Sequence, residues 1–235
     1  MELSPTQLDI WLATVLGGLL KRHPVIDLGF QSAIRHNVLG GFWFAAALFA
    51  FWVIAARNGQ QKIRVRILTI LAGTALTILL TIVAGAMVSW PPPIRYPGLA
   101  QLFPAYLESY PNTNCFPSQS TALYGTVAMG IYSLHRLTGT VLWAAVAVFV
   151  AFPRMYVGGH YLTDVIVGVV LALIGYAGAL YLFEKRLVPA LDAFFESRTS
   201  LRTLRDLLVF AWILQVAVEF RDAVWVTRIL EVLKG

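Results

Sequence analysis

The stretch LTDVIVGVVLALIGYAGALYLF at residues 162–183 decides the class of fold, because its only charged side chain is Asp164. About 20 apolar residues in an α-helix are long enough to cross the hydrocarbon core of a bilayer. Comparable apolar stretches occupy residues 38–56, 67–89, 119–134 and 138–152. The chain is therefore expected to be a polytopic membrane protein built from helices.

The composition agrees with that class. Of the 235 residues, 58% are hydrophobic and 13% are charged, against about 25% charged in a soluble domain. The net charge of +6 would suggest nucleic acid in a soluble protein. Here the basic residues lie in short loops between apolar stretches, so they predict orientation in a membrane and no nucleic-acid partner.

The single cysteine, Cys115, excludes an internal disulfide and a cysteine metal cluster. Residues 1–7 lack the basic start and cleavage site of a secretory signal, so we expect the chain to be mature.

Residues 1–186 are expected to form an all-α membrane helix bundle of about six spans. That number includes residues 9–20, an apolar but short stretch that is either an interfacial helix or a short first span. The mixed segment 187–235 contains an apolar stretch at residues 207–218, which is shorter than the ~20 residues of a crossing helix. We expect this segment to form C-terminal amphipathic helices that lie on the membrane or pack on a partner, a second copy of the chain included. A tilted seventh span is the alternative.

The distribution of basic residues predicts how the bundle is oriented. Four basic residues lie in the loop 57–66, and five more follow between residues 185 and 205. The proline-rich segment 90–118 and the loop 153–160 carry one arginine each. The positive-inside rule places the loop 57–66 and the C-terminus in the cytoplasm. The two other loops then face outward together from the inner or plasma membrane, into the periplasm in a bacterium.

The two outward loops hold the residues with a plausible chemistry. His160 and Asp164 are four residues apart, so on a helix they share a face and can hydrogen-bond. A carboxylate on one ring nitrogen fixes the tautomer and leaves the other nitrogen as a nucleophile or base. Arg154 offers a planar donor fork to phosphate oxygens. Ser118, near the start of a span, adds a hydroxyl and backbone N–H groups, which form a natural anion site. The structural alternative is an interfacial Arg154–Asp164 ion pair with a capping histidine.

These motifs resemble a known family. The pattern Arg-x5-His-x3-Asp at residues 154–164 follows a Pro-Ser-x-x motif at residues 117–120. Together they are similar to the type 2 phosphatidic acid phosphatase family of membrane lipid phosphatases, over roughly residues 20–185. The resemblance implies a site that uses neither a metal nor a cofactor. It also assigns the nucleophile, the carboxylate that orients it and the phosphate-binding arginine to His160, Asp164 and Arg154.

The chain departs from the family pattern at two points. Where the family has a histidine that serves as general acid, Ser120 stands. Where the family's first motif has basic residues, Trp90 and Pro92 stand, although a looser alignment keeps one arginine, Arg95. Ser120 is either natural divergence or an engineered change that traps substrate, and the thinned first motif favours divergence. The expected site therefore comprises the catalytic His160, Asp164 and Ser120 and the phosphate-binding Arg154, Ser118, Arg95 and Gln119.

The missing acid affects the expected substrate. General acid catalysis contributes about 10²–10⁴ in rate, and an alkoxide leaving group depends on it most. A lipid diphosphate instead expels a lipid monophosphate, which is stable as an anion. We therefore expect hydrolysis of a lipid diphosphate, such as a polyprenyl diphosphate, through a phosphohistidine on His160. The alternatives are phosphate transfer to another acceptor, and an inactive scaffold that binds or transports a lipid phosphate.

Overall fold

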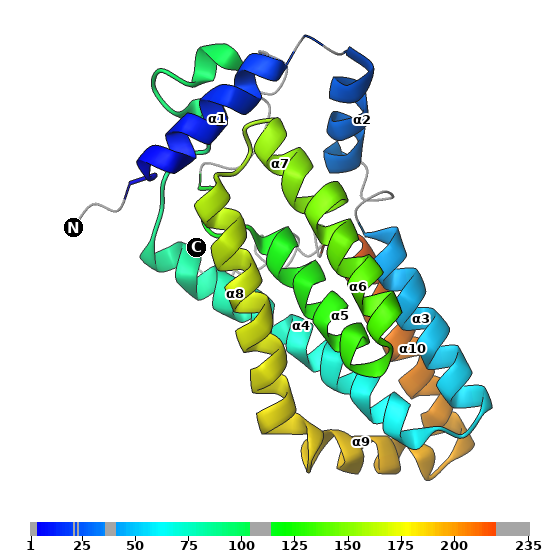
Figure 1. The fold of residues 1–235 in the computed structure, drawn as a ribbon. Coiled ribbons are helices and arrows are strands. Elements are labelled where there is room, and N and C mark those ends of the chain that lie inside the picture. The colour runs from blue at the N-terminus through cyan, green and yellow to red at the C-terminus, as the bar shows by residue number, and fades with distance from the viewer. Residues whose placement is uncertain (1–3, 21, 23, 36–40, 104–113, 220–235) are drawn as a thin grey trace, which may run out of the picture.

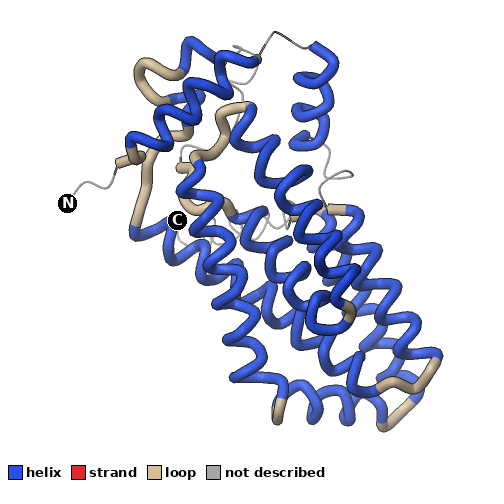
Figure 2. Tube along the Cα trace, viewed as in Figure 1, coloured by secondary structure: helices blue, strands red, loops and turns tan. Residues whose placement is uncertain are grey.

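The computed structural model describes residues 4–20, 22, 24–35, 41–103 and 114–219. The predicted all-α class is confirmed, because this part of the chain contains helices and turns but no strand (Figure 2). The α-helices are α1 (Gln7–Leu19), α2 (Pro24–Arg35), α3 (Phe42–Arg57), α4 (Gln61–Met87), α5 (Gln119–Leu134), α6 (Arg136–Ala145), α7 (Phe152–Tyr156), α8 (Leu162–Ala179), α9 (Leu187–Glu196) and α10 (Thr199–Ala217).

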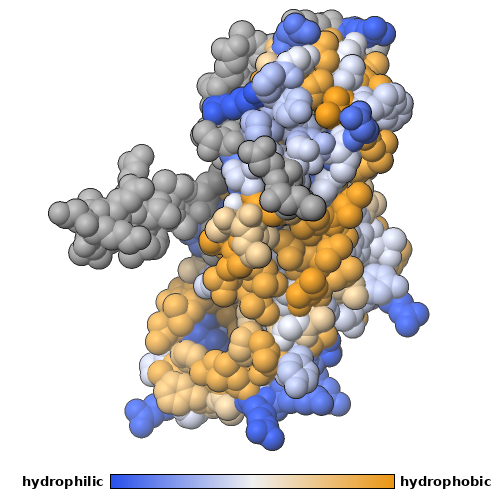
Figure 3. All heavy atoms as spheres, turned by 90° about the vertical axis from the view of Figure 1, so that its left-hand side faces the viewer, coloured by the Kyte–Doolittle hydropathy of each residue, from blue (hydrophilic) through white to orange (hydrophobic). Residues whose placement is uncertain are grey.

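The helices have the dimensions of a membrane bundle. Within the described residues, three helical runs are long and apolar enough to cross a bilayer: Gln61–Met87, Arg136–Tyr156 and Leu162–Glu184. Figure 3 shows a broad apolar surface over the middle of the molecule, with more polar surface at both ends. A belt of this kind is the surface that lipid tails cover. The protein is therefore an integral membrane protein.

Helices α4, α5 and α8 pack closely in the middle of the bundle, and small residues permit it. A Cβ on Gly130 of α5 would lie 2.4 Å from the Ile70 side chain of α4, and one on Gly175 of α8 would lie 1.9 Å from Thr77 Oγ1. Thr77 also shares a hydrogen bond of 2.8 Å with Thr126 of α5. Small residues at the contacts and hydroxyl groups between helices are the usual means of helix association in membranes.

A second apolar cluster lies at one end of the bundle. It joins α1 to the segment 88–103 and to the turn after α7, with Trp90, Phe103 and Tyr161 among its buried side chains. We call this cluster the cap. Asp9 of α1 links the cap to α8, because the Asp9 carboxylate accepts hydrogen bonds from the Thr163 backbone N–H at 2.9 Å and from the Thr163 hydroxyl at 2.7 Å. The cap encloses the end of the bundle where α8 begins (Figure 1).

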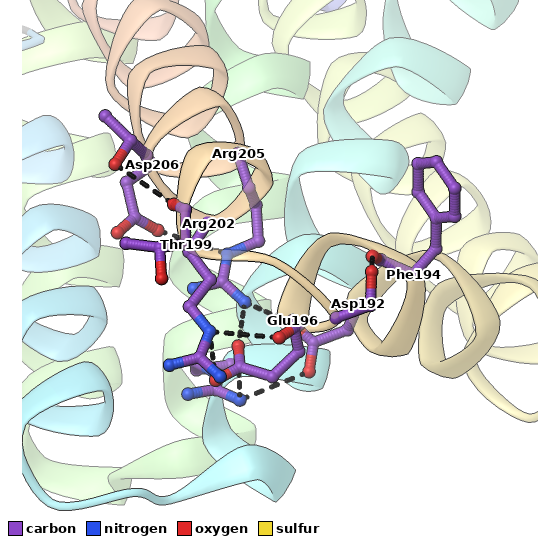
Figure 4. Close-up of polar contacts among 10 residues, drawn as sticks. Asp192, Phe194, Glu196, Thr199, Arg202, Arg205 and Asp206 are labelled. Carbon is purple, nitrogen blue, oxygen red and sulfur yellow. Dashed lines mark hydrogen bonds and ion pairs between the residues drawn. The ribbon is translucent and has the colours of Figure 1, made fainter.

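The C-terminal helices pack on the bundle itself. Helix α9 lies across the end of the bundle opposite α1, and α10 returns alongside α3 (Figure 1). Asp192 and Glu196 of α9 pair with Arg205 of α10, and Figure 4 shows these side chains pointing toward one another. Helix α10 contributes Val209, Ile213 and Val216 to the main apolar core. Residues 220–235 lie outside the described residues.

Candidate active site

The turn between α7 and α8 places the arginine and histidine of the 154–164 motif. The Arg154 carbonyl accepts hydrogen bonds from the backbone N–H groups of Gly159 at 2.8 Å and His160 at 3.2 Å. Gly158 has φ +77°, and a Cβ there would lie 2.5 Å from the Phe103 ring. Glycine is the residue that adopts this conformation without strain. The residues between Arg154 and His160 therefore form one tight turn, and this turn sets the spacing of the two side chains in the motif.

His160 is buried and its ring is oriented by a backbone carbonyl. Its Nδ1 lies 2.8 Å from the Cys115 carbonyl oxygen. A carbonyl only accepts hydrogen bonds, so we assign the proton to Nδ1. The Nε2 atom then keeps its lone pair, as a nucleophile requires. Asp164 Oδ2 lies 3.6 Å from the same Nδ1, which is an electrostatic distance rather than a hydrogen bond.

Asp164 is fully buried behind His160 and holds two other donors. Its Oδ2 accepts from the Tyr161 backbone N–H at 2.8 Å, and its Oδ1 accepts from the Trp90 indole N–H at 3.1 Å. The carboxylate thus joins the start of α8, the histidine and the proline-rich segment. The sequence analysis noted Trp90 only as a departure from the family's first motif, so its hydrogen bond to the site was missed. The available signal was its position, where the family pattern has a basic residue.

The buried Arg154 meets a carboxylate that the sequence analysis did not single out. Its guanidinium donates Nη1 to the Val150 carbonyl at 3.1 Å and Nη2 to Glu219 Oε1 at 2.5 Å. The other oxygen, Oε2, accepts from Ser120 Oγ at 2.8 Å. Arg154 and Ser120 are therefore brought together through Glu219, at the end of α10. The only signal in the sequence was an acidic residue directly after the apolar stretch 207–218.

The remaining expected phosphate ligands are placed differently. Ser118 is fully buried, its hydroxyl lies 2.9 Å from Thr121 Oγ1, and its N–H donates to the Asp164 carbonyl at 3.1 Å. Gln119 is exposed in the first turn of α5, and Arg95 is exposed in the short 3-10 turn Pro93–Arg95. Arg154 is thus buried in the site, whereas Arg95 lies at the surface of the cap. Their contacts with phosphate stay predictions.

Two further ionisable side chains at this site are kept neutral by burial. Burial raises the pKa of the Cys115 thiol, and the charge of Asp164 raises it further. Burial likewise raises the pKa of the Tyr161 phenol. Neither group ionises near neutral pH, because desolvation disfavours the charged form. The thiol and the phenol are therefore not candidates for the nucleophile or a base.

Comparison with known proteins establishes the class. The model of the PAP2 superfamily matches residues 66–187, which include the whole of the 117–120 and 154–164 motifs. The chain belongs to this superfamily, the family of membrane lipid phosphatases that its motifs resemble.

Individual relatives agree with that assignment. The chain is 28% identical over 142 residues to the bacitracin transport permease protein BcrC of Bacillus licheniformis, and the match covers 60% of this chain and 64% of BcrC. It therefore spans less than two thirds of that relative. The crystal structure of Aquifex aeolicus LpxE has the same fold, with a TM-score of 0.55 and 22% identity, over 77% of this chain and 99% of LpxE.

Proposed function

We propose that this protein is a membrane lipid phosphatase that hydrolyses a lipid diphosphate, of the polyprenyl type, through a phosphohistidine on His160. The observation that carries the proposal is the hydrogen bond between His160 Nδ1 and the Cys115 carbonyl. That bond fixes the tautomer whose Nε2 lone pair is nucleophilic, and backbone hydrogen bonds of the motif turn join His160 to the buried Arg154. The similarity to a transport permease protein supports a role at the membrane.

The first chemical step uses the groups that the site already orients. The Nε2 lone pair attacks the terminal phosphorus, and the bond from phosphorus to the bridging oxygen breaks. The electron pair stays on that oxygen, so the lipid monophosphate leaves as an anion. Asp164 stabilises the positive charge that develops on the ring, as a carboxylate behind a histidine does in other nucleophilic sites.

The serine at position 120 favours a diphosphate over a monophosphate ester. A hydroxyl of ordinary acidity does not release a proton near pH 7, so Ser120 cannot protonate an alkoxide. A phosphate leaving group is stable as an anion and needs little protonation. The preserved histidine and arginine then suffice for the first step.

We further propose that the site faces the exterior and that α10, which packs on the bundle but lies outside the three runs that qualify by length and hydropathy, is the tilted seventh span. Its 19 residues rise about 28 Å, close to the ~30 Å thickness of the hydrocarbon core. It begins beside α9 and ends at Glu219, which contacts Arg154 and Ser120. With the basic loop 57–66 in the cytoplasm, α10 starts on that side and ends on the outer side. In this topology the segment after residue 186 does not stay in the cytoplasm. It contains the tilted seventh span that was the alternative in the sequence analysis.

The test is phosphate release from a polyprenyl diphosphate by the purified protein in detergent. We expect His160→Ala to abolish release. The matched control is His135→Asn at the exposed α5–α6 junction, where His135 caps α6 by accepting from the Thr138 N–H and asparagine is also a good cap. Release that persists in His160→Ala overturns the proposal.

The same assay separates the alternatives. Transfer is measured as labelled phosphate that appears on an added alcohol or lipid acceptor instead of in solution. A chain that binds the labelled diphosphate but neither releases nor transfers phosphate, with or without Ser120→His, is a binding protein.

A further inference from the structure

The carboxylate of Glu219 lies between two residues of the proposed phosphate chemistry. One oxygen accepts from Arg154 and the other from Ser120, and the Glu219 and Arg154 side chains are 9% and 3% exposed. Glu219 lies beyond residue 187, where the family match ends. The carboxylate therefore enters the site from a part of the chain outside the matched family region.

Several contacts hold the end of α10 at this place. The Tyr124 hydroxyl donates to the Ala217 carbonyl at 3.3 Å. A Cβ on Gly41 would lie 2.1 Å from the same carbonyl oxygen, so a residue without a side chain is needed there. Glu219 itself has φ +57°, a left-handed conformation that other described non-glycine residues do not adopt. Such positions are uncommon, persist where surrounding contacts determine them, and cluster at functional sites.

Hydrolysis through a phosphohistidine requires a base that the first step does not use. Water attacks phosphorus in the second step, and its proton must pass to a nearby group. Asp164 is fully buried with both oxygens engaged by donors behind His160. Cys115 and Tyr161 are buried, and because burial raises the pKa of both groups they already carry their protons near neutral pH. Among the described residues of the site, the carboxylate that contacts Arg154 and Ser120 is that of Glu219.

We propose that Glu219 is the general base for the second step, an assignment that rests on the proposed phosphohistidine mechanism. A water molecule attacks the phosphorus on His160 while one of its protons passes to a carboxylate oxygen of Glu219. The bond between Nε2 and phosphorus breaks, and its electron pair returns to Nε2. Inorganic phosphate leaves with the water oxygen, His160 regains its Nδ1–H tautomer, and Glu219 then loses its proton to solvent. Ser120 orients the carboxylate by its hydrogen bond.

The test is Glu219→Gln in the full chain, with a lipid diphosphate labelled in the terminal phosphate. Glutamine keeps the shape and an oxygen acceptor for Arg154 but cannot take a proton. Loss of a general base lowers turnover by about 10²–10⁴-fold. We expect steady-state release to fall by that factor while labelled protein accumulates, seen as alkali-stable, acid-labile label after a rapid alkaline quench. A carboxylate that acts as general base gives the pH profile of kcat an acidic limb, and this limb should be absent from Glu219→Gln.

Two matched variants make the result specific. Glu184→Gln removes a carboxylate from the Arg66–Glu184 pair, 2.8 Å long and away from His160, and should leave turnover within about twofold of the parent, as expected for a partly exposed ion pair. Ser120→His combined with Glu219→Gln restores a proton acceptor beside the site. The turnover of this double variant should be at least tenfold higher than that of Glu219→Gln. A purely structural role of Glu219 predicts no such recovery.

Other outcomes overturn the assignment in distinguishable ways. Unchanged turnover in Glu219→Gln means that another base acts. Faster turnover means that the carboxylate blocks Arg154 and competes with phosphate. Labelled protein absent from the parent and from Glu219→Gln, with release that survives His160→Ala, removes the phosphohistidine mechanism and this assignment with it.

Discussion

The molecule buries an arginine–carboxylate cluster at each end of α10, and the two clusters differ in how their charges are arranged. At the α9 end, Arg205 contacts both Asp192 and Glu196, and Arg64 of α4 lies 3.4 Å from each of these carboxylates. At the other end, the single carboxylate of Glu219 takes one arginine and one serine hydroxyl.

The difference indicates which cluster stabilises the fold and which serves chemistry. The α9 cluster joins α4, α9 and α10 through paired charges, because Arg64 and Arg205 each contact both carboxylates. Arg205 also lies over the Trp52 ring of α3 at 5.3 Å. The Glu219 cluster connects Arg154 of the 154–164 motif to Ser120 of the 117–120 motif. We infer that the first is a structural joint and the second is part of the site.

Removing a carboxylate from the α9 cluster should have the largest effect on stability. Asp192→Ala leaves Arg64 and Arg205 buried with one carboxylate fewer, and removing one member of a buried pair costs about 3–5 kcal/mol. We expect the free energy of unfolding in detergent to fall by that amount, while kcat of the folded fraction stays within about twofold because the site is at the other end. A large loss of kcat at unchanged stability would contradict the division between the clusters.

Arg154→Lys should show the reverse pattern. Lysine keeps the charge but replaces the planar donor fork by a point charge, which is a poor exchange where phosphate is bound bidentately. Removing one preorganised donor from a transition state costs about 10²–10³ in rate. We expect kcat/KM for the lipid diphosphate to fall by that factor, with a smaller change in Tm than Asp192→Ala causes. A loss of Tm as large as that of Asp192→Ala would make Arg154 structural too.

Trp90→Phe tests the hydrogen bond between Trp90 and Asp164 in the candidate active site. It keeps an aromatic ring in the cap but removes the indole N–H that donates to Asp164. A hydrogen bond to a charged group contributes about 1.5–3 kcal/mol, so we expect phosphate release to slow by roughly tenfold or more. The control is Trp43→Phe on the exposed face of α3, measured in the same assay. Equal rates for both variants would show that Trp90 only packs.

The smallest of the expected effects is the loss of stability of the α9 cluster at acidic pH. The hydrogen bond from Arg205 lowers the pKa of Glu196, so its contribution to stability is present above the ordinary glutamate pKa of about 4.3. That contribution is lost as the pH falls through the lowered pKa in the folded state. We expect Tm to differ between the chain and Glu196→Gln at about pH 7, and the difference to shrink as the pH falls below the ordinary glutamate pKa of about 4.3. A constant difference across this range would mean that Glu196 stays ionised or contributes nothing.

Regular features of the chain were predictable because they depend on neighbouring residues. The span expected at residues 119–134 is α5, and the long apolar run from residue 162 is α8. The turn that joins Arg154 to His160 follows from motif spacing and a glycine at position 158. Contacts between distant segments were not predictable: Glu219 meets Arg154 from 65 residues away and Ser120 from 99 residues away.

The sequence by itself determined the class of this protein, because apolar length, charge bias and motif spacing are local properties that one chain displays without folding. It also identified His160, Asp164, Arg154 and Ser120 as the residues to consider. Tertiary structure alone decided that Cys115 orients the histidine, that Trp90 holds Asp164 and that α10 brings a carboxylate to Ser120. The physical reason is that these contacts depend on how helices pack in three dimensions, and packing joins residues whose positions in the sequence carry no common pattern.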